Sequence, residues 1–231
     1  MPRDSRLVTI SELVPLNSRV ADIGTDHAYL PIHLIKEGVC RSVIATDINT
    51  KPLAVAQKNI EKSGVKNIEL RLCDGLHNIK PDEVDTIIIA GMGGEVISGI
   101  INRCDWIKNS CYKLILQPMS RSEDLRKFLC ENGFEILAEH GTEHAGRVYT
   151  VMEVVFNNFN EQVDNLFYYI GKLTENLGEN ELKYIKWRRK VLFEKSFKIK
   201  DISGKEIEYK QTLDVVNRID RILLRNEEKC R

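Results

Sequence analysis

Three carboxylates follow three successive apolar stretches of this sequence, each with a small residue nearby. Asp22 ends the first stretch and precedes Gly24, Asp47 ends the second, and Asp74 follows the third and precedes Gly75. If these stretches are parallel strands of one sheet, their carboxyl ends lie along one edge, where nucleotide-derived cofactors bind. The chemistry open to these residues is therefore recognition of such a cofactor through its hydroxyl, amino and cationic groups.

The first turn distinguishes between cofactors. A dinucleotide-binding turn needs Gly-x-Gly-x-x-Gly, in which the second glycine lets the backbone approach a pyrophosphate. This sequence has Gly24 at the first position, Asp26 at the second and Tyr29 at the third. Like charges about 4 Å apart in a partly shielded site repel by several kcal/mol, so Asp26 disfavours NAD and FAD. S-adenosylmethionine, which lacks phosphate and carries an ammonium and a sulfonium, suits a turn with Asp22 and Asp26.

The later strand ends add complementary groups. Asp47, with Ile48 beside it, lies where an acidic residue accepts hydrogen bonds from ribose hydroxyls. Asp74 is expected to accept a hydrogen bond from the adenine amino group, and Gly75 to leave room for the ring. Helix capping explains any one of these aspartates equally well, but the three together favour the cofactor.

A glycine cluster follows the fourth apolar stretch. Its backbone N–H groups are expected to face a flat substrate or the methionine end of the cofactor. A helix start that needs close backbone approach is an equally good explanation. The residues concerned are Ala90, Gly91, Met92 and Gly93.

These residues must be positioned by alternating strands and helices, which the hydrophobic pattern predicts. Five strand–helix units are followed by two strands joined only by a short loop at 141–146. A parallel connection needs a dozen or more residues, so this last pair must be antiparallel. We therefore predict an α/β fold with a seven-stranded, Rossmann-like sheet and an antiparallel last strand, as in class I methyltransferases. The expected strands are 19–22, 42–47, 68–72, 85–90, 113–116, 134–139 and 147–156.

Hydroxyl and carboxylate side chains are expected to cap the helices. Asp4 or Ser5 precedes a short amphipathic helix, and Thr50 precedes the helix after the second strand. Ser120 or Ser122 is expected to cap the helix over 123–132.

The remainder of the chain, 157–231, is polar, with apolar residues every three or four positions from Val163 to Leu177 and from Leu213 to Leu223. This spacing predicts two or three helices that form an antiparallel, coiled-coil-like hairpin. We thus expect two domains, a cofactor-binding domain over 1–156 and a helical domain over 157–231. The second has three more basic than acidic residues, a mild tilt toward an anionic partner.

Composition excludes several other classes. No apolar run approaches the roughly 18–20 residues of a membrane span, and Met1–Thr9 lacks the apolar core of a signal peptide. The six cysteines are scattered without a Cys-x-x-Cys pair, so we expect reduced, structural thiols, no metal site and a cytoplasmic protein.

Several motifs together resemble the bacterial tRNA (adenine-N1)-methyltransferases that modify position 22 in the D arm. The resemblance covers 1–156 in order and is most specific from Asp22 to Pro31. It implies methylation of adenine N1 of tRNA by S-adenosylmethionine. We expect the protein to be a monomer or weak dimer. The motifs are Asp22–Pro31, Ala45–Asp47, Asp74–Gly75, Ala90–Gly94, Gln117–Met119 and His144–Tyr149.

For that reaction we expect three residues of the first turn to meet the target base. Asp26 is a candidate acceptor for the adenine amino group, while His27 and Tyr29 are candidates to stack on the base or hydrogen-bond to it. A histidine at a helix start is an equally good explanation of His27. Neutral adenine has a lone pair at N1, so the reaction needs no general base and depends on positioning and electrostatics.

RNA contacts are expected from basic residues in three regions. Those of the tail surround Trp187, a composition that suits RNA, although a solvated helix face with Trp187 packed inside explains them slightly better. The candidates are Arg6, His144, Arg147, Lys186, Arg188 and Arg189. The alternatives are a methyltransferase for a small molecule or protein, with a dimerising tail, and a cofactor-binding scaffold. The nicotinamide oxidoreductase is disfavoured by Asp26 and the antiparallel strand pair.

Overall fold

A run of β-branched residues, Thr86–Ile89, lies at the centre of the sheet in the computed structural model, which describes residues 4–175 and 177–229. Ile87 and Ile89 belong to the core on one face, and Ile88 to the core on the other. All three are fully buried. Such a strand must be covered by helices on both faces.

The sheet has the order β3-β2-β1-β4-β5-β7-β6. The first five strands pair in parallel, whereas β7 is antiparallel to both β5 and β6, so the predicted topology is confirmed. The strands are β1 (Ser18–Ile23), β2 (Cys40–Asp47), β3 (Ile68–Leu72), β4 (Thr86–Gly93), β5 (Lys113–Ser120), β6 (Phe134–His144) and β7 (Arg147–Phe156).

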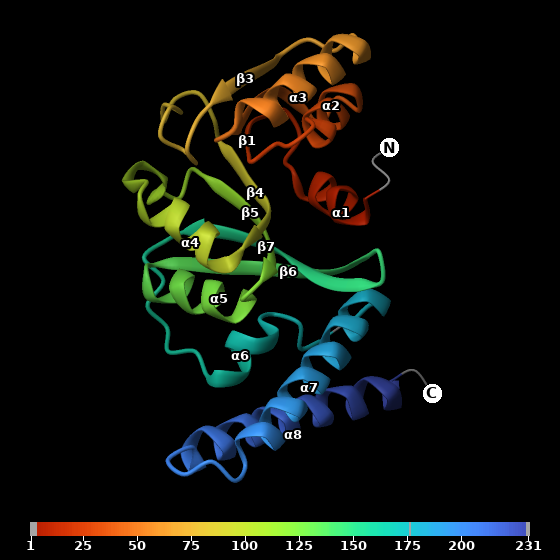
Figure 1. Ribbon diagram of the computed structural model, residues 1–231, viewed down its shortest axis with the longest axis vertical. Coiled ribbons are helices and arrows are strands. Elements are labelled where there is room, and N and C mark those ends of the chain that lie inside the picture. Colours follow the sequence, from red (N-terminus) through yellow and green to blue (C-terminus); the bar gives the residue numbers. More distant parts are fainter. Residues whose placement is uncertain (1–3, 176, 230–231) are drawn as a thin grey trace.

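Helices cover both faces of this sheet (Figure 1). Ile10, Leu30 and Leu34 bring the first two helices onto one face, and Ile97 and Leu125 bring the fourth and fifth onto the other. The helices are α1 (Ser5–Leu13), α2 (Tyr29–Lys36), α3 (Thr50–Ser63), α4 (Gly94–Asn102) and α5 (Ser122–Glu131), with a 3-10 turn at Asp105–Ile107.

The prediction that residues 141–146 form a loop is wrong. β6 continues to His144, and only Ala145 and Gly146 form the turn, with φ of +50° and +72°. Two positive φ values give a tight two-residue hairpin whose twist matches the strands. The pairing therefore extends to His144 opposite Arg147.

Two predicted helix caps are also wrong, whereas Asp4 does cap α1, accepting a hydrogen bond from the Arg6 backbone at 3.0 Å. Asn49 occupies the cap position of α3 instead of Thr50. Before α5 neither serine caps, because β5 extends to Ser120 and Arg121 adopts a left-handed conformation that starts the helix at Ser122.

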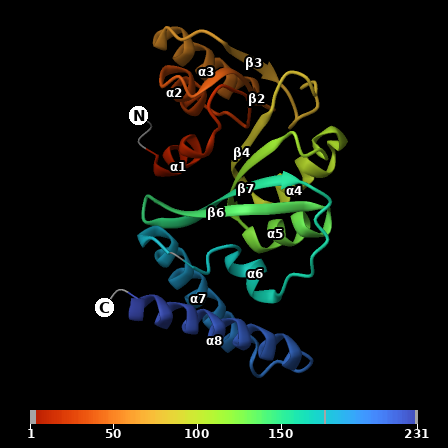
Figure 2. The ribbon, with the colours of Figure 1, turned by 180° about the vertical axis from the view of Figure 1, so that it is seen from behind.

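The tail folds into α6 (Asn165–Ile170), α7 (Glu179–Ile199) and α8 (Glu206–Lys229). The apolar spacing between Val163 and Leu177 continues beyond the short helix α6, which ends at Gly171 with a φ of +59°. α7 begins beside β6 and leads away from the sheet to α8, with which it forms a hairpin (Figures 1 and 2). Its coiled-coil character and the boundary at 156/157 remain predictions.

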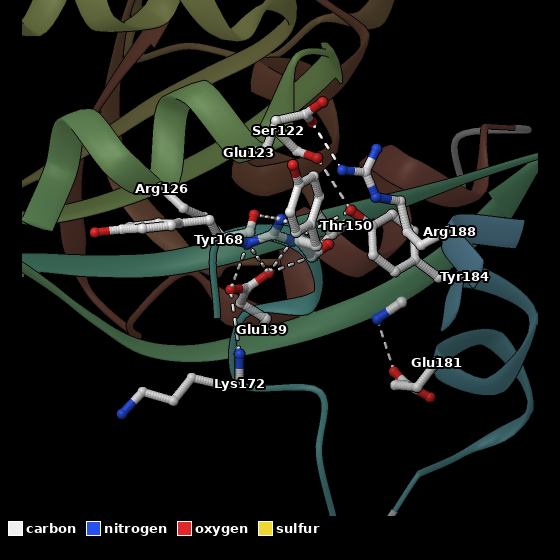
Figure 3. A network of polar contacts seen from close by, with 12 residues as sticks. Ser122, Glu123, Arg126, Glu139, Thr150, Tyr168, Lys172, Glu181, Tyr184 and Arg188 are labelled. Atoms are coloured by element: carbon white, nitrogen blue, oxygen red, sulfur yellow. Dashed lines mark hydrogen bonds and ion pairs between the residues drawn. The ribbon is translucent and has the colours of Figure 1, made fainter. Parts of the chain in front are cut away.

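A buried ion pair joins the tail to the sheet (Figure 3). Arg126 of α5 and Glu139 of β6 have fully buried side chains 2.8 Å apart. Arg126 also donates to the backbone carbonyls of Tyr168 and Tyr169, at 2.9 and 3.2 Å. Its second terminal nitrogen donates to the Tyr184 hydroxyl of α7 at 3.2 Å. The charges are thus paired and hydrogen-bonded, as a buried pair requires.

Within residues 4–175 and 177–229, no helix is both long and apolar enough to span a membrane. The same residues contain no group of three or more His, Cys, Asp or Glu side chains arranged to hold a metal ion.

Candidate functional site

A cavity of about 1000 Å³ lies at the carboxyl ends of the central strands. The segment from Asp22 to Leu30 supplies the largest part of its wall. The end of β2, the ends of β4 and β5, and the start of α1 with the end of β6 supply the rest. The lining residues are Asp4, Arg6, Leu7, Asp22, Gly24, Thr25, Asp26, His27, Tyr29, Leu30, Asp47, Ala90, Gly91, Met92, Gln117, Met119 and His144.

The turn after β1 is fixed by backbone geometry. The backbone N–H groups of Gly24 and Thr25 both donate to the Thr46 carbonyl at 2.8 Å, which ties the turn to β2. Gly24 has a φ of +75°, and a Cβ there would lie 2.3 Å from the Met92 methyl carbon. The left-handed conformation favours glycine here, whereas the flexible end of Met92 can move away from a Cβ.

Asp22 is a buried carboxylate in the cavity wall, only 5% exposed. Burial raises its pKa to about 6, although the neighbouring Thr25 side chain acts in the opposite direction. Among the described residues Asp22 has no ion-pair partner. A buried carboxylate without a cation is suited to receive a positively charged ligand.

Asp26, His27 and Tyr29 lie together on the cavity wall. The side chain of Asp26 is 69% exposed, and its carboxylate lies 3.5 Å from Nε2 of His27. The rings of His27 and Tyr29 meet edge to face, with centroids 5.6 Å apart. Nδ1 of His27 is buried without a hydrogen-bond partner.

The remaining predicted cofactor residues divide into two groups. Asp47 lines the cavity and accepts a hydrogen bond from the Asn49 backbone at 2.7 Å. Asp74 instead lines a neighbouring hollow of about 310 Å³ and forms an ion pair with Arg103 at 2.9 Å. Ile48, Gly75 and Gly93 are not in the cavity lining, and a Cβ on Gly75 would lie 3.0 Å from Ile100. Gly75 therefore allows close approach of Ile100 in helix α4, and its place beside the adenine ring stays a prediction.

The glycine cluster ends β4 and is held by a residue whose role the sequence reasoning missed. Gln117 is 1% exposed and accepts a hydrogen bond from the Gly91 backbone at 3.1 Å, so this N–H is not free for a ligand. The bond lies where the register of β4 and β5 shifts between Ala90 and Met92. The signal in the sequence for this role of Gln117 was a polar residue directly after the apolar run Leu114–Leu116 of β5.

One side of the cavity mouth is built from α1 and β6. Asp4 forms an ion pair with Arg6 at 2.5 Å and lies 3.5 Å from Nδ1 of His144. Burial favours the neutral acid, but the hydrogen bonds from Arg6 outweigh it and lower the pKa of Asp4. The Arg6 guanidinium also lies 5.3 Å from the centre of the Tyr149 ring. Arg6 is therefore neutralised and only partly accessible to a phosphate, whereas Arg147 is exposed.

The basic residues of the tail differ in accessibility. Arg188 is 5% exposed and forms an ion pair with Glu123 at 3.0 Å, so the prediction that it contacts RNA is wrong for the chain as folded. Arg189 pairs with Asp220 at 2.9 Å. Lys186 is exposed, and Trp187 is 42% exposed instead of packed inside.

A family model and a curated relative each match about two thirds of the chain. Residues 3–152 match a family model described as a methyltransferase domain. The tRNA (adenine(22)-N(1))-methyltransferase of Bacillus subtilis is 36% identical over 148 residues, which span 64% of this chain and 62% of that protein. The match thus spans less than two thirds of that curated relative.

Solved structures match over more of the chain. A crystal structure from Streptococcus pneumoniae, of a tRNA (m1A22) methyltransferase candidate, has a TM-score of 0.81 and 31% identity, covering 96% of this chain and 99% of that one. The same protein in complex with S-adenosyl-L-methionine has a TM-score of 0.79 and 30% identity, covering 94% and 98%.

Proposed function

Since this chain belongs to the methyltransferase-domain family, and within it to the bacterial tRNA (adenine(22)-N1)-methyltransferases, we propose that it methylates N1 of adenine 22 in the D arm of tRNA. The methyl donor is S-adenosylmethionine, which supplies a methyl group activated on a sulfonium centre. The observation that carries the proposal is the cavity with the unpaired, buried Asp22 at the strand ends.

The residues present fit this cofactor. The carboxylate of Asp22 can pair with the ammonium group, and Asp47 can accept hydrogen bonds from the ribose hydroxyls. Gly24 keeps the turn free of a side chain. Asp74 would have to exchange Arg103 for the adenine amino group.

The chain's part in the transfer is positioning and electrostatic stabilisation. Asp26 and His27 of the same turn and Tyr29 at the start of α2 line the cavity, so a base that enters it can meet their side chains. Asp26 can accept a hydrogen bond from the adenine amino group and stabilise the positive charge that the base gains. Adenine N1 is on the Watson–Crick edge, so tRNA must present this base unpaired.

We also propose that tRNA is bound partly by the tail, and that the protein acts in the cytoplasm as a monomer or weak dimer. The exposed Lys186 and Trp187 support RNA contact by α7. Cys40, Cys73, Cys104, Cys111 and Cys130 all have free thiols, consistent with a reducing compartment. The sixth, Cys230, lies outside the described residues.

The test is to incubate the protein with labelled S-adenosylmethionine and bulk tRNA that is unmodified at position 22. Digestion of the RNA is expected to yield label only in N1-methyladenosine. Label in N6-methyladenosine or in a guanosine derivative would show that the base or the nitrogen is wrong.

Asp26→Asn is expected to lower turnover about tenfold, because a neutral amide stabilises the cationic base less than a carboxylate does. The fold should be unaffected, since the side chain is mostly exposed. Steady-state kinetics with saturating tRNA and a thermal melt measure the two effects. Wild-type turnover in this variant would remove Asp26 from the mechanism.

Replacing Lys186 and Trp187 together by alanine is expected to weaken tRNA binding about tenfold, through loss of one phosphate contact and one stacking surface. Filter binding at several salt concentrations should show that the slope of log Kd against log salt concentration is smaller by about one, which corresponds to one phosphate contact. Arg189→Ala is the matched control, because Arg189 is already paired with Asp220. Equal tRNA affinities of the double variant and the wild type would show that this face of α7 does not contact tRNA.

A further inference from the structure

The first turn of α7 rests on β6 close to the end of that strand. Glu181, the third residue of α7, accepts a hydrogen bond from the Gly141 backbone at 2.7 Å. Figure 3 shows this carboxylate at the beginning of the helix. A Cβ on Gly141 would lie 2.5 Å from the Glu181 nitrogen and 2.6 Å from the Asn180 carbonyl carbon. The helix and the strand are therefore in direct backbone contact here.

Two residues farther along β6, the contact continues toward α1. Lys183 of α7 forms an ion pair with Glu143 at 2.8 Å. The backbone carbonyl of Glu143 accepts a hydrogen bond from the Ser5 hydroxyl, at the first residue of α1. Glu143 is thus bonded to the tail through its side chain and to α1 through its backbone.

The segments joined in this way carry one side of the cavity mouth. His144 follows Glu143 and lies 3.5 Å from Asp4, which precedes Ser5 and is paired with Arg6. Asp4, Arg6 and His144 all line the cavity. A continuous series of contacts therefore runs from the start of α7 to the residues around the entrance.

We propose that Glu181 and Lys183 are positioning residues for methyl transfer. They hold the end of β6, and through it the start of α1, so that the cavity mouth presents the target adenine correctly. This role rests on the proposed function and is distinct from contact between the tail and RNA. The tail then acts on the rate of the chemical step as well as on tRNA affinity.

Gly141 offers a direct test, because alanine there must push α7 away from β6. Its φ lies outside the positive region, so alanine meets no local strain and only this contact is disturbed. Gly99→Ala in α4 is the matched control, since a Cβ at Gly99 meets no atom within 4 Å. The measurements are kcat for tRNA methylation, the Kd of tRNA, the Kd of S-adenosylmethionine and a thermal melt.

For Gly141→Ala we expect kcat to fall at least about tenfold, because displacements near 1 Å at a reacting centre reduce rates by up to a hundredfold. The Kd of S-adenosylmethionine should stay within about twofold, because Asp22 and Asp47 lie on other elements, and tRNA affinity should change little. Gly99→Ala should match the wild type. An unchanged kcat, or weaker tRNA binding with full kcat at saturation, would overturn the proposal.

A second pair of variants covers the case in which Gly141→Ala does not fold. Glu181→Ala removes the acceptor for the Gly141 backbone and is expected to lower kcat, whereas Glu181→Gln keeps an acceptor oxygen and should restore it. Equal kcat values for wild type, Glu181→Ala and Lys183→Ala would overturn the positioning role alone. Failure of the wild type to form N1-methyladenosine in tRNA would instead overturn the proposed function.

Discussion

Asp22→Asn is expected to weaken binding of S-adenosylmethionine about thirtyfold and to make the unliganded protein more stable at pH 8. The loss of affinity, about 2 kcal/mol, follows from replacing the anionic acceptor of a charge-assisted hydrogen bond with the ammonium group by a neutral amide oxygen. The gain in stability has a separate cause, which is the burial of that charge in the absence of a cation.

The pH dependence follows from the direction of the pKa shift. Burial raises the pKa of Asp22 from 3.8 to about 6, so the folded state binds the proton more tightly than the unfolded state. The ionised carboxylate therefore destabilises the fold above pH 6, by roughly 3 kcal/mol, and this penalty declines as the pH falls toward 3.8. The asparagine variant should gain up to that amount at pH 8 and about half of it at pH 5.

Urea unfolding of the unliganded protein at pH 8 and pH 5, together with calorimetric titration of the cofactor, measures both effects. Asp26→Asn is the matched control, because it makes the same chemical change at a carboxylate that is mostly exposed. It should not gain stability. Full cofactor affinity in Asp22→Asn would contradict the assignment of Asp22 to the ammonium group.

Arg126→Met is expected to destabilise the protein by about 3–5 kcal/mol, because it leaves the Glu139 carboxylate buried without its cation. The midpoint of thermal unfolding should fall by roughly 10 °C for a chain of this size. The backbone carbonyls of Tyr168 and Tyr169 lose their donor at the same time, so proteolysis should cut sooner near α6.

The matched control is Arg189→Met, which breaks the half-exposed pair with Asp220 and should change stability by about 0–1 kcal/mol. The double variant Arg126→Met with Glu139→Gln should recover part of the loss, since no buried charge then remains unpaired. If Arg126→Met were as stable as Arg189→Met, the buried pair would not hold the tail to the sheet.

Much of the fold could be predicted from the sequence because the signals are local. The β-branched run in β4 identifies a strand buried on both faces, and the short connection between β6 and β7 excludes a parallel crossover. The predicted length of the loop in that hairpin was wrong. The turn depends on a left-handed conformation of Ala145, which an alanine in the sequence does not indicate.

In the candidate site, too, the local features could be predicted from the sequence and the contacts between distant residues could not. The sequence by itself determined the turn with Asp22, Gly24 and Asp26, because these residues are adjacent in the chain and follow one strand. Only the tertiary structure decided that Arg188 is buried against Glu123, that Asp74 pairs with Arg103, and that Gln117 binds the Gly91 backbone. In each case the partner lies 26 or more positions away. Its choice depends on how helices pack for Arg188 and Asp74, and on the register between β4 and β5 for Gln117. Residue type and spacing identify which groups can bind or react, whereas the partner that satisfies each charge is decided by packing.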